Sequence, residues 1–236
     1  MSLMLENVGV RYGGVTALDA VSLRVPPAGV VGLIGPNGAG KTTLINAITG
    51  VVRPNSGTIA LGDLRLDGLA PHRVAHAGVA RTYQNIRLFG ALSVGANVRA
   101  GAYRRAGLLG DDEIRALLAQ ALVGDDDLAR RAGSLAYGEQ RRLEIARALA
   151  SKPQILLLDE PAAGMNQRES GELRELIRDI ARAGTGVLLV EHDMSLVRAV
   201  CDHVVVLNFG KVIAEGTAAS VSRDPAVIEA YLGSTA

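Results

Sequence analysis

Residues 35 to 43 read Gly35-Pro36-Asn37-Gly38-Ala39-Gly40-Lys41-Thr42-Thr43 and match the spacing Gly-x-x-x-x-Gly-Lys-Ser/Thr. This spacing is typical of a loop that wraps the phosphates of a nucleoside triphosphate when a strand precedes it and a helix follows it. Residues 30–34 form a short, apolar, β-branched run, which predicts a buried parallel strand. The apolar spacing of residues 43–48, with Gly50 beyond them, predicts a short helix. This context favours a phosphate-binding loop (P-loop) over a chance glycine turn.

The residue types of the P-loop suit phosphate binding. Glycines let the backbone approach the phosphates and take positive φ where the loop turns. The loop N–H groups then point into one concavity at the positive end of the helix dipole. We expect Lys41 to reach the β- and γ-phosphates, Thr42 to ligate Mg²⁺ and Thr43 to add an α-phosphate contact. The predicted nucleotide contacts are therefore Gly35, Pro36, Asn37, Gly38, Ala39, Gly40, Lys41, Thr42 and Thr43.

Length and composition suit one large α/β domain or a domain with an inserted subdomain, since the chain has 236 residues and 48% hydrophobic content. The net charge of +1 gives no field that favours nucleic acid, so we expect no nucleic-acid partner. The single cysteine, Cys201, excludes an internal disulfide, and its apolar neighbours predict a buried side chain. The N-terminus lacks the pattern of a signal peptide, and no apolar run approaches the ~20 residues of a membrane-spanning helix.

Strand-like and helix-like runs alternate in the C-terminal part of the chain, which predicts a parallel sheet with helices on both faces. Short β-like runs occupy residues 5–12, 17–25 and 57–61, and a strand is expected at 78–83. Residues 85–150 have mostly helical patterns, and we interpret them as a helical insert. The alternation covers strands at 154–159, 186–190 and 203–207 with helices at 168–183 and 193–200, and it ends in a hairpin around 208–211 and a helix at 225–232.

Two of these strands are followed by side chains that can bind a metal or transfer a proton. The run Ile155 to Pro161 ends in Asp159 and Glu160, and ligands of open α/β sheets bind beyond the carboxyl ends of strands. We therefore expect Asp159 to hold Mg²⁺ and Glu160 to polarise the attacking water. The strand at 187–190 is followed by His192, which should face the γ-phosphate. A strand with an acidic turn and a structural histidine is the alternative, and the P-loop disfavours it.

Several motifs occur in one chain, and because of them the chain resembles the ATP-binding subunits of ABC transporters over its whole length. The marker is Leu135-Ala136-Tyr137-Gly138-Glu139-Gln140-Arg141-Arg142-Leu143, which lies where that family carries its signature sequence. Tyr12 matches the aromatic residue that stacks on adenine, Gln84 the Q-loop glutamine, and His192 the switch histidine. Residues 162–166 match the D-loop. The implied fold is α/β, with a mainly parallel P-loop (RecA-like) sheet flanked by helices, an antiparallel β subdomain and an inserted helical subdomain at about 85–150 of a single domain, 1–236.

Within that family the chain is most similar to the ATPase subunits of branched-chain amino-acid importers. Three runs carry this narrower resemblance: 81–89, 136–147 and the tail 226–233. The first two also resemble importers of other polar solutes, including urea and short amides. The transported solute itself is chosen by other subunits, so the sequence leaves it open.

The signature departs from the usual Leu-Ser-Gly-Gly-Gln at Ala136 and Tyr137. Ala136 has no hydroxyl to meet the γ-phosphate of a partner's nucleotide. The remaining donors would be backbone N–H groups near Gly138 and the start of the helix at Glu139. One neutral hydrogen bond contributes only ~1 kcal/mol, so we expect weaker closure on ATP but retained activity.

The resemblance implies a site that is split between two protomers. One protomer would supply the P-loop, Tyr12 and the catalytic residues Lys41, Gln84, Glu160 and His192, with Thr42, Gln84 and Asp159 at Mg²⁺. The other would supply the D-loop and Leu135, Ala136, Tyr137, Gly138, Glu139 and Gln140. ATP and Mg²⁺ are the implied cofactors.

The implied partners are transmembrane permease subunits, a second ATPase subunit and, indirectly, an extracytoplasmic solute-binding protein. Whether the dimer is homo- or heteromeric stays open, although the resemblance favours a heterodimer. The chain would lie peripherally on the cytoplasmic face of the cell membrane. Leu88 and Phe89 are the candidates for docking a permease helix, with ordinary core packing as the alternative.

Two other function classes are weighed against the importer. An ABC exporter uses the same module, but the Ala136-Tyr137 signature and the run 85–89 argue against it. ABC ATPases outside transport carry a second module, a long coiled-coil insert or metal-site partners, and the sequence shows none of these features. A P-loop GTPase is disfavoured because no Asn-Lys-x-Asp run occurs.

Overall fold

A mainly parallel sheet forms the centre of the computed structural model, which describes residues 1–104, 109–124 and 127–232. The strand order in these residues is β10-β9-β3-β8-β7-β6, and only β9 and β10 are antiparallel neighbours. The strands are β3 (Val30–Ile34), β6 (Val79–Arg81), β7 (Ile155–Asp159), β8 (Gly186–Val190), β9 (His203–Asn208) and β10 (Lys211–Gly216). The predicted alternation and the β9–β10 hairpin are confirmed, whereas the strand expected at 78–83 is limited to Val79–Arg81.

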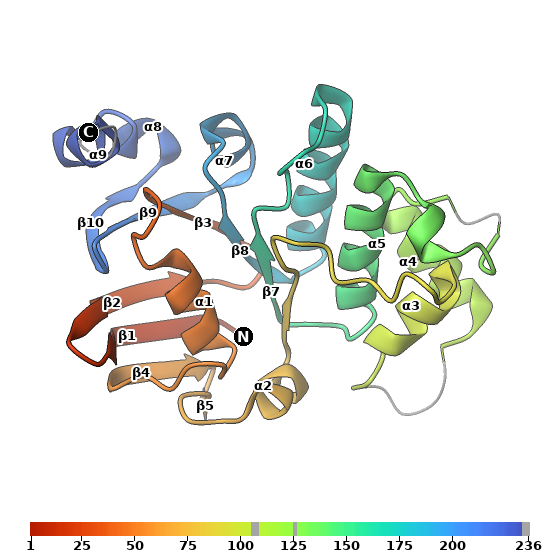
Figure 1. Cartoon of the computed structure of the whole chain (residues 1–236), viewed down its shortest axis with the longest axis horizontal. Helices are drawn as coiled ribbons and strands as arrows, with labels where there is room; N and C mark the ends of the chain where they lie inside the picture. Colours follow the sequence, from red (N-terminus) through yellow and green to blue (C-terminus); the bar gives the residue numbers. More distant parts are fainter. Residues whose placement is uncertain (105–108, 125–126, 233–236) are drawn as a thin grey trace.

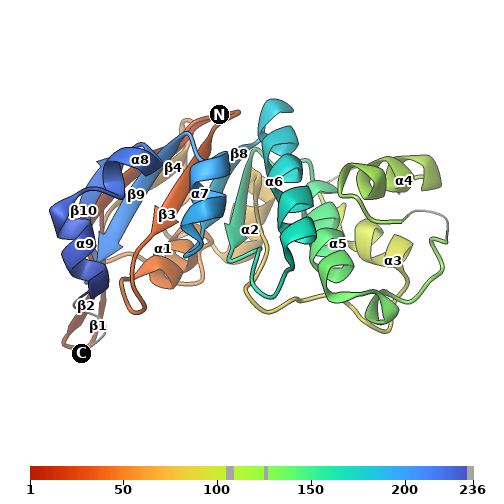
Figure 2. The same cartoon turned by 90° about the horizontal axis from the view of Figure 1, so that it is seen from above.

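The central strands bury side chains on both faces of this sheet. Along β7, Leu156 and Leu158 join the core on the side of α6, whereas Ile155 and Leu157 join the core around α1. Successive side chains of a strand point to opposite faces, so a strand that is covered on both sides is apolar throughout. Helix α1 (Lys41–Ile48) covers one face, and α6 (Gln167–Arg182) and α7 (Met194–Val200) cover the other (Figures 1 and 2).

A second, antiparallel sheet lies beyond α1 (Figure 1). Its strand order is β2-β1-β4-β5, with β1 (Leu3–Tyr12), β2 (Val15–Val25), β4 (Ser56–Leu61) and β5 (Leu64–Arg65). Side chains of β1, β2 and β4 share one core with α1 and the parallel sheet, for example Leu5 and Ile59 with Leu44. This shared core fixes α1, and with it the P-loop, between the two sheets.

Between β6 and β7 the chain forms a helical layer of α3 (Val94–Gly101), α4 (Asp111–Gln120), the 3₁₀ turn Ala132–Ser134 and α5 (Tyr137–Leu149). Helix α4 begins at the predicted acidic run, where negative charge suits the helix dipole. Val98, Leu118 and Leu143 bring α3, α4 and α5 into the core that also contains α6. The layer lies at the end of the molecule away from the antiparallel sheet (Figure 1).

The remaining helices are short, except for α6. Helix α6 begins with a capping box, in which the Asn166 side chain accepts from Glu169 N at 3.0 Å and Glu169 accepts from Asn166 N at 3.0 Å. The others are α2 (Pro71–Ala77), α8 (Ala218–Val221) and α9 (Pro225–Leu232). The sequence did not predict α8, because four residues are too few to show a helical period. No helix among the described residues is long and apolar enough to cross a membrane.

Candidate nucleotide-binding site

The P-loop joins β3 to α1, and its glycines take conformations that other residues avoid. Gly35, Gly38 and Gly40 have φ values of 149°, 78° and 106°. A Cβ at Gly35 would lie 2.1 Å from Leu207 O, and one at Gly40 would lie 2.8 Å from Ala17 O. The loop therefore fits against its own chain only because these positions lack side chains.

The P-loop lines a cavity of about 430 Å³. Two residues that the sequence placed near the γ-phosphate, Gln84 and Glu160, line the same cavity. The rest of the lining is Val15, Thr16, Ala17, residues 37–43, Phe209 and Gly210. Tyr12 is exposed at the end of β1 and is not part of this lining, so adenine stacking by Tyr12 stays a prediction.

Lys41 sits at the first turn of α1 and folds back on the loop that precedes it. Its Nζ donates to the carbonyl oxygens of Gly35 and, at 3.0 Å, of Pro36. Burial lowers the pKa of Lys41, whereas the negative charges of Glu160 and Asp159 act in the opposite direction. The negative charges of Glu160 and Asp159 therefore favour the protonated, phosphate-binding form of Lys41.

The end of β7 brings three predicted site residues together. Gln84 Nε2 donates to Glu160 Oε2 at 2.8 Å, and His192 Nδ1 lies 3.8 Å from the same oxygen. Glu160 has φ +47°, and its N–H donates to Val190 O at 2.9 Å. Positive φ in a residue with a side chain is uncommon and costs roughly 1–3 kcal/mol, and such strain is concentrated at functional sites.

The predicted Mg²⁺ ligands offer oxygen atoms of the kind that this ion prefers. Thr42 contributes a hydroxyl, Asp159 a carboxylate and Gln84 an amide oxygen that its bond to Glu160 leaves unused. The described residues contain no group of three or more His, Cys, Asp or Glu side chains that could cage a metal. Thr42 and Gln84 line the cavity, whereas Asp159 does not and its Oδ2 accepts from Arg81. These oxygen donors are of the type that holds Mg²⁺ by few protein groups together with nucleotide phosphates.

The signature residues 135–140 lie outside this cavity. Ala136 is the N-cap residue of α5 and, without a side-chain oxygen, receives only half of a capping box: Glu139 accepts from Ala136 N at 3.2 Å. A Cβ at Gly164 of the D-loop would lie 3.1 Å from the Tyr137 ring. The signature and the D-loop segment therefore meet at Tyr137 and Gly164, which are both exposed, away from the P-loop of the same chain (Figure 1).

Comparisons with known proteins decide the family. Residues 18–163 match the model described as ABC transporter, and residues 211–236 match that of the branched-chain amino acid ATP-binding cassette transporter. The chain belongs to the ABC transporter family. The ATP-binding subunits of this family hydrolyse ATP, dimerise and work with transmembrane permeases.

Relatives and solved structures agree with this assignment. The chain is 42% identical to the high-affinity branched-chain amino acid transport ATP-binding proteins LivG of Escherichia coli K12 and BraF of Pseudomonas aeruginosa, with 98% of this chain and 97% of each relative covered. The ADP conformation of the ABC transporter cassette MJ1267 aligns with a TM-score of 0.88 and 29% identity over 99% of both chains. A dimeric bacterial cassette, MJ0796, aligns at 0.81 and 25% over 92% of this chain and 98% of its own. The predicted fold class is confirmed.

In this ABC ATPase, Glu191 is a site residue that the sequence did not single out. Its buried carboxylate accepts from Ala162 N at 3.0 Å and from His192 N at 3.2 Å. Burial raises the pKa of Glu191, while the N–H groups of Ala162, Asp193 and His192 lower it. Glu191 thus joins Ala162, in the predicted D-loop, to His192, the predicted switch histidine. Its place at the end of a buried strand was the one signal that could have found it.

Phe209 is a second residue that sequence reasoning missed. It lines the cavity from the β9–β10 hairpin, although its side chain is 84% exposed, and its φ is +45°. The hairpin was predicted, but its contact with the P-loop was not: Gly210 N donates to Ala39 O at 2.9 Å. This contact joins residues that lie far apart in the sequence, so no local pattern contains it.

Helix α5 is hydrogen-bonded to the chain segment around Gln84. Arg141, which is fully buried, donates to the carbonyl oxygens of Tyr83 and Gln84 and to Glu144. Glu144 accepts from Arg87 N at 3.0 Å. Burial raises the pKa of Glu144, and Arg141 and Arg147 act against this. Helix α5 is therefore hydrogen-bonded directly to the predicted Q-loop of the same chain.

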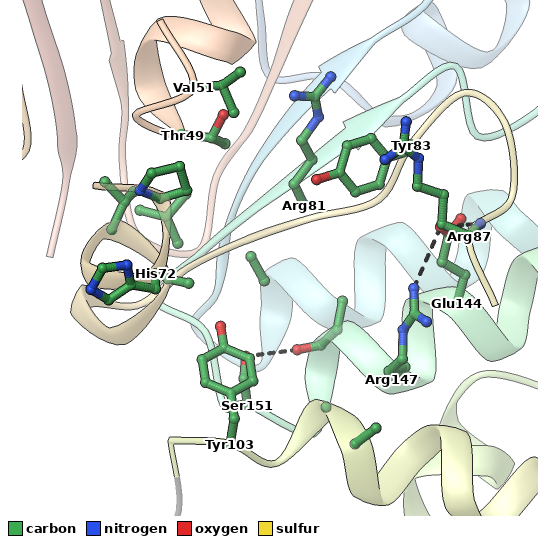
Figure 3. A pocket seen from close by; sticks show the side chains of 18 of the residues that line it. Thr49, Val51, His72, Arg81, Tyr83, Arg87, Tyr103, Glu144, Arg147 and Ser151 are labelled. Carbon is green, nitrogen blue, oxygen red and sulfur yellow. Dashed lines mark hydrogen bonds and ion pairs between the residues drawn. The ribbon is translucent and has the colours of Figure 1, made fainter. Parts of the chain in front are cut away.

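A groove of about 600 Å³ separates α2 from the helical layer (Figure 3). Tyr83, Phe89, Tyr103 and the guanidinium groups of Arg81, Arg87 and Arg147 are among the residues that line it. Phe89 is 53% exposed, whereas Leu88 packs against the core. Of the two docking candidates, only Phe89 lines this groove.

Proposed function

We propose that this ABC ATPase powers an importer of branched-chain amino acids. The observation that carries the proposal is the 42% identity to LivG and BraF along nearly the whole chain. The match of residues 211–236 supports the same solute class, because this segment lies outside the ATP-binding motifs. We propose one ABC-type domain over residues 1–236, with a helical subdomain at about 85–150.

We propose the following roles in ATP binding and hydrolysis. Residues 35–43 hold the phosphates, and Tyr12 stacks on adenine. Thr42, Gln84 and Asp159 hold Mg²⁺, which neutralises phosphate charge when it is bound. Glu160 polarises the attacking water, and its contacts with Gln84 and His192 place that carboxylate at the cavity.

The site is completed by a second ATPase subunit, which we propose to be a related chain in a heterodimer. That subunit supplies the segments that correspond to residues 135–140 and 162–166 of this chain. ATP closes the dimer because contacts to the γ-phosphate are made only across it. Hydrolysis removes those contacts and reopens the dimer, which is a population shift driven by differential affinity. The position of the signature outside its own chain's cavity supports this arrangement.

The groove docks a helix of a permease subunit on the cytoplasmic side of the membrane, and an extracytoplasmic binding protein delivers the solute. Exposed Phe89 supplies apolar area beside Arg147, whose Cζ lies 5.6 Å from the ring centroid. The bonds from Arg141 and Glu144 to residues 83–87 provide a path from the groove to Gln84.

Solute uptake by the source cells tests the proposal. Leucine uptake is compared between wild type and a chromosomal Glu160→Gln variant, with cold isoleucine, valine and urea as competitors. We expect uptake to be lost in the variant and suppressed in wild type by the branched-chain competitors. Uptake that urea suppresses, or that the variant retains in cells without a redundant system, contradicts the solute class.

Groove docking is tested in proteoliposomes that contain the permease subunits. Phe89→Ala should leave nucleotide affinity near wild type but reduce transport per ATP hydrolysed, because the ring lies in the groove and outside the nucleotide cavity. Tyr103→Ala, at the same groove, shows whether any lost aromatic ring has this effect. Retained coupling in the Phe89 variant refutes its docking role.

A further inference from the structure

Arg81, at the end of β6, joins the predicted Mg²⁺ carboxylate to the helix of the P-loop. Its Nη2 donates to Asp159 Oδ2 at 2.9 Å, and its Nη1 donates to Asn46 Oδ1 at 2.7 Å. The side chains of Arg81 and Asp159 are only 9% and 10% exposed. A planar guanidinium with two fixed partners holds the Asp159 carboxylate in one orientation.

The same guanidinium also borders the groove. Arg81 Cζ lies 4.6 Å from the centroid of the Tyr83 ring, and Arg87 Cζ lies 4.4 Å from it. All three residues line the groove, and in Figure 3 the ring lies between the two arginine side chains. Arg81 Nε is buried and has no hydrogen-bond partner among the described residues.

We propose that Arg81 is a positioning residue through which the groove controls the Mg²⁺ affinity of the nucleotide site. The inference rests on the proposed ATP site and docking groove. A partner segment in the groove contacts the Tyr83 ring and shifts the guanidinium that rests on it. Asp159 then turns with Arg81, because the two share a short, buried ion pair. Residues that orient a metal ligand typically change metal affinity about 10- to 100-fold when they are replaced.

The experiment measures the affinity of the purified chain for a fluorescent ADP analogue in EDTA and at increasing Mg²⁺ concentrations. Arg81→Gln should raise the half-saturating Mg²⁺ concentration by about tenfold or more and leave the affinity in EDTA near wild type. Arg81→Lys keeps the charge but cannot hold both Asn46 and Asp159, so we expect an intermediate value. Circular dichroism checks that each variant is folded.

The connection to the groove is tested at Tyr83, which does not touch Asp159 itself. Tyr83→Leu removes the ring under Arg81 and should raise the half-saturating Mg²⁺ concentration about two- to fivefold, whereas Tyr83→Phe should not. Tyr103→Leu is the matched control, because it removes an aromatic ring of the same groove that contacts His76 instead.

Three results would overturn the proposal. An Mg²⁺ dependence of Arg81→Gln within twofold of wild type, or tighter than wild type, removes the positioning role. An equal loss of affinity in EDTA shows damage to the nucleotide site that does not involve the metal. Equal Mg²⁺ dependence in Tyr83→Leu and Tyr83→Phe removes the connection to the groove. None of these results affects the uptake experiment, so the two proposals fail separately.

Discussion

The P-loop and the signature segment are predicted to touch the same kind of nucleotide, yet their own chain holds them very differently. Around residues 35–43 the chain closes on itself, with Gly35 against Leu207 O and Ala39 O bonded to Gly210. Around residues 135–140 the surface is open, and Ala136 and Tyr137 are exposed. The difference shows that one chain shapes the phosphate-binding loop by itself, and it supports the proposal that the signature acts on the nucleotide of another subunit.

The largest effect should come from Glu160, the proposed catalytic carboxylate beside the P-loop. Glu160→Gln keeps an acceptor for Gln84 but loses the base, so turnover should fall about 10²- to 10⁴-fold with nucleotide affinity retained. Steady-state phosphate release and an equilibrium titration measure the two quantities. Glu175→Gln, which changes an exposed carboxylate on α6, is the control. A single-turnover rate near wild type would contradict the role of Glu160.

The reaction rates of two thiols compare the packing behind the P-loop with that at the signature: Cys201 in the first region and an Ala136→Cys thiol in the second. Cys201 lies behind the P-loop strand, where a Cβ at Gly32 would be 2.9 Å from its Sγ. Burial raises the pKa of Cys201 from 9.0 to about 12, so at pH 8 its thiolate fraction is about a thousandfold lower than that of an ordinary thiol. An Ala136→Cys variant should gain a thiol that reacts rapidly with a disulfide reagent.

The same pKa shift has a consequence for stability. Below pH 9 the Cys201 thiol is protonated in both states, and as pH rises toward 12 the unfolded chain loses that proton first. The folded state therefore loses stability over this range.

In the thiol experiment, equal rates of reaction with the disulfide reagent for Cys201 and for the thiol of Ala136→Cys in the folded protein would contradict the packing difference. The denatured protein, in which both thiols react, is the control.

Removing the charge at the P-loop should have the next largest effect. Lys41→Ala loses at least one hydrogen bond from a charged donor, worth about 1.5–3 kcal/mol, so nucleotide affinity should fall by about 10- to 150-fold or more. Titration with a fluorescent ATP analogue measures this change. Lys152→Ala is the control, since Lys152 does not line the cavity. Unchanged affinity would mean that the contacts of Lys41 with the loop carbonyls matter more than phosphate binding.

The smallest effect is expected at the signature. Ala136→Ser restores the hydroxyl that the usual signature has, and one hydrogen bond of ~1 kcal/mol corresponds to at most about fivefold tighter dimerisation on ATP. Light scattering in a Glu160→Gln background measures the dimer, and Ala129→Ser is a control outside the signature. A marked weakening of the dimer would show that Ala136 is adapted to closure in a way that the missing hydroxyl does not explain.

Local patterns account for what the sequence predicted well. The P-loop spacing, the apolar strands at 155–159 and 186–190, and the acidic start of α4 each lie within a few consecutive residues. Their backbone geometry follows from glycine freedom, burial on both sheet faces and the helix dipole. The strand ends also predicted that Glu160 and His192 lie near each other, because parallel strands end at the same edge of a sheet, whereas Gln84 was predicted from the family resemblance.

The sequence by itself determined the nucleotide-binding module, its mainly parallel sheet and the residue types that face phosphate. Only the tertiary structure decided which distant groups hold them: Arg81 on Asp159, Glu191 on Ala162, and Arg141 on the carbonyl oxygens of residues 83 and 84. These contacts join residues 78, 29 and 57–58 positions apart. The physical reason is that a buried charge must find a partner wherever the folded chain supplies one, and sequence periodicity does not record such a choice.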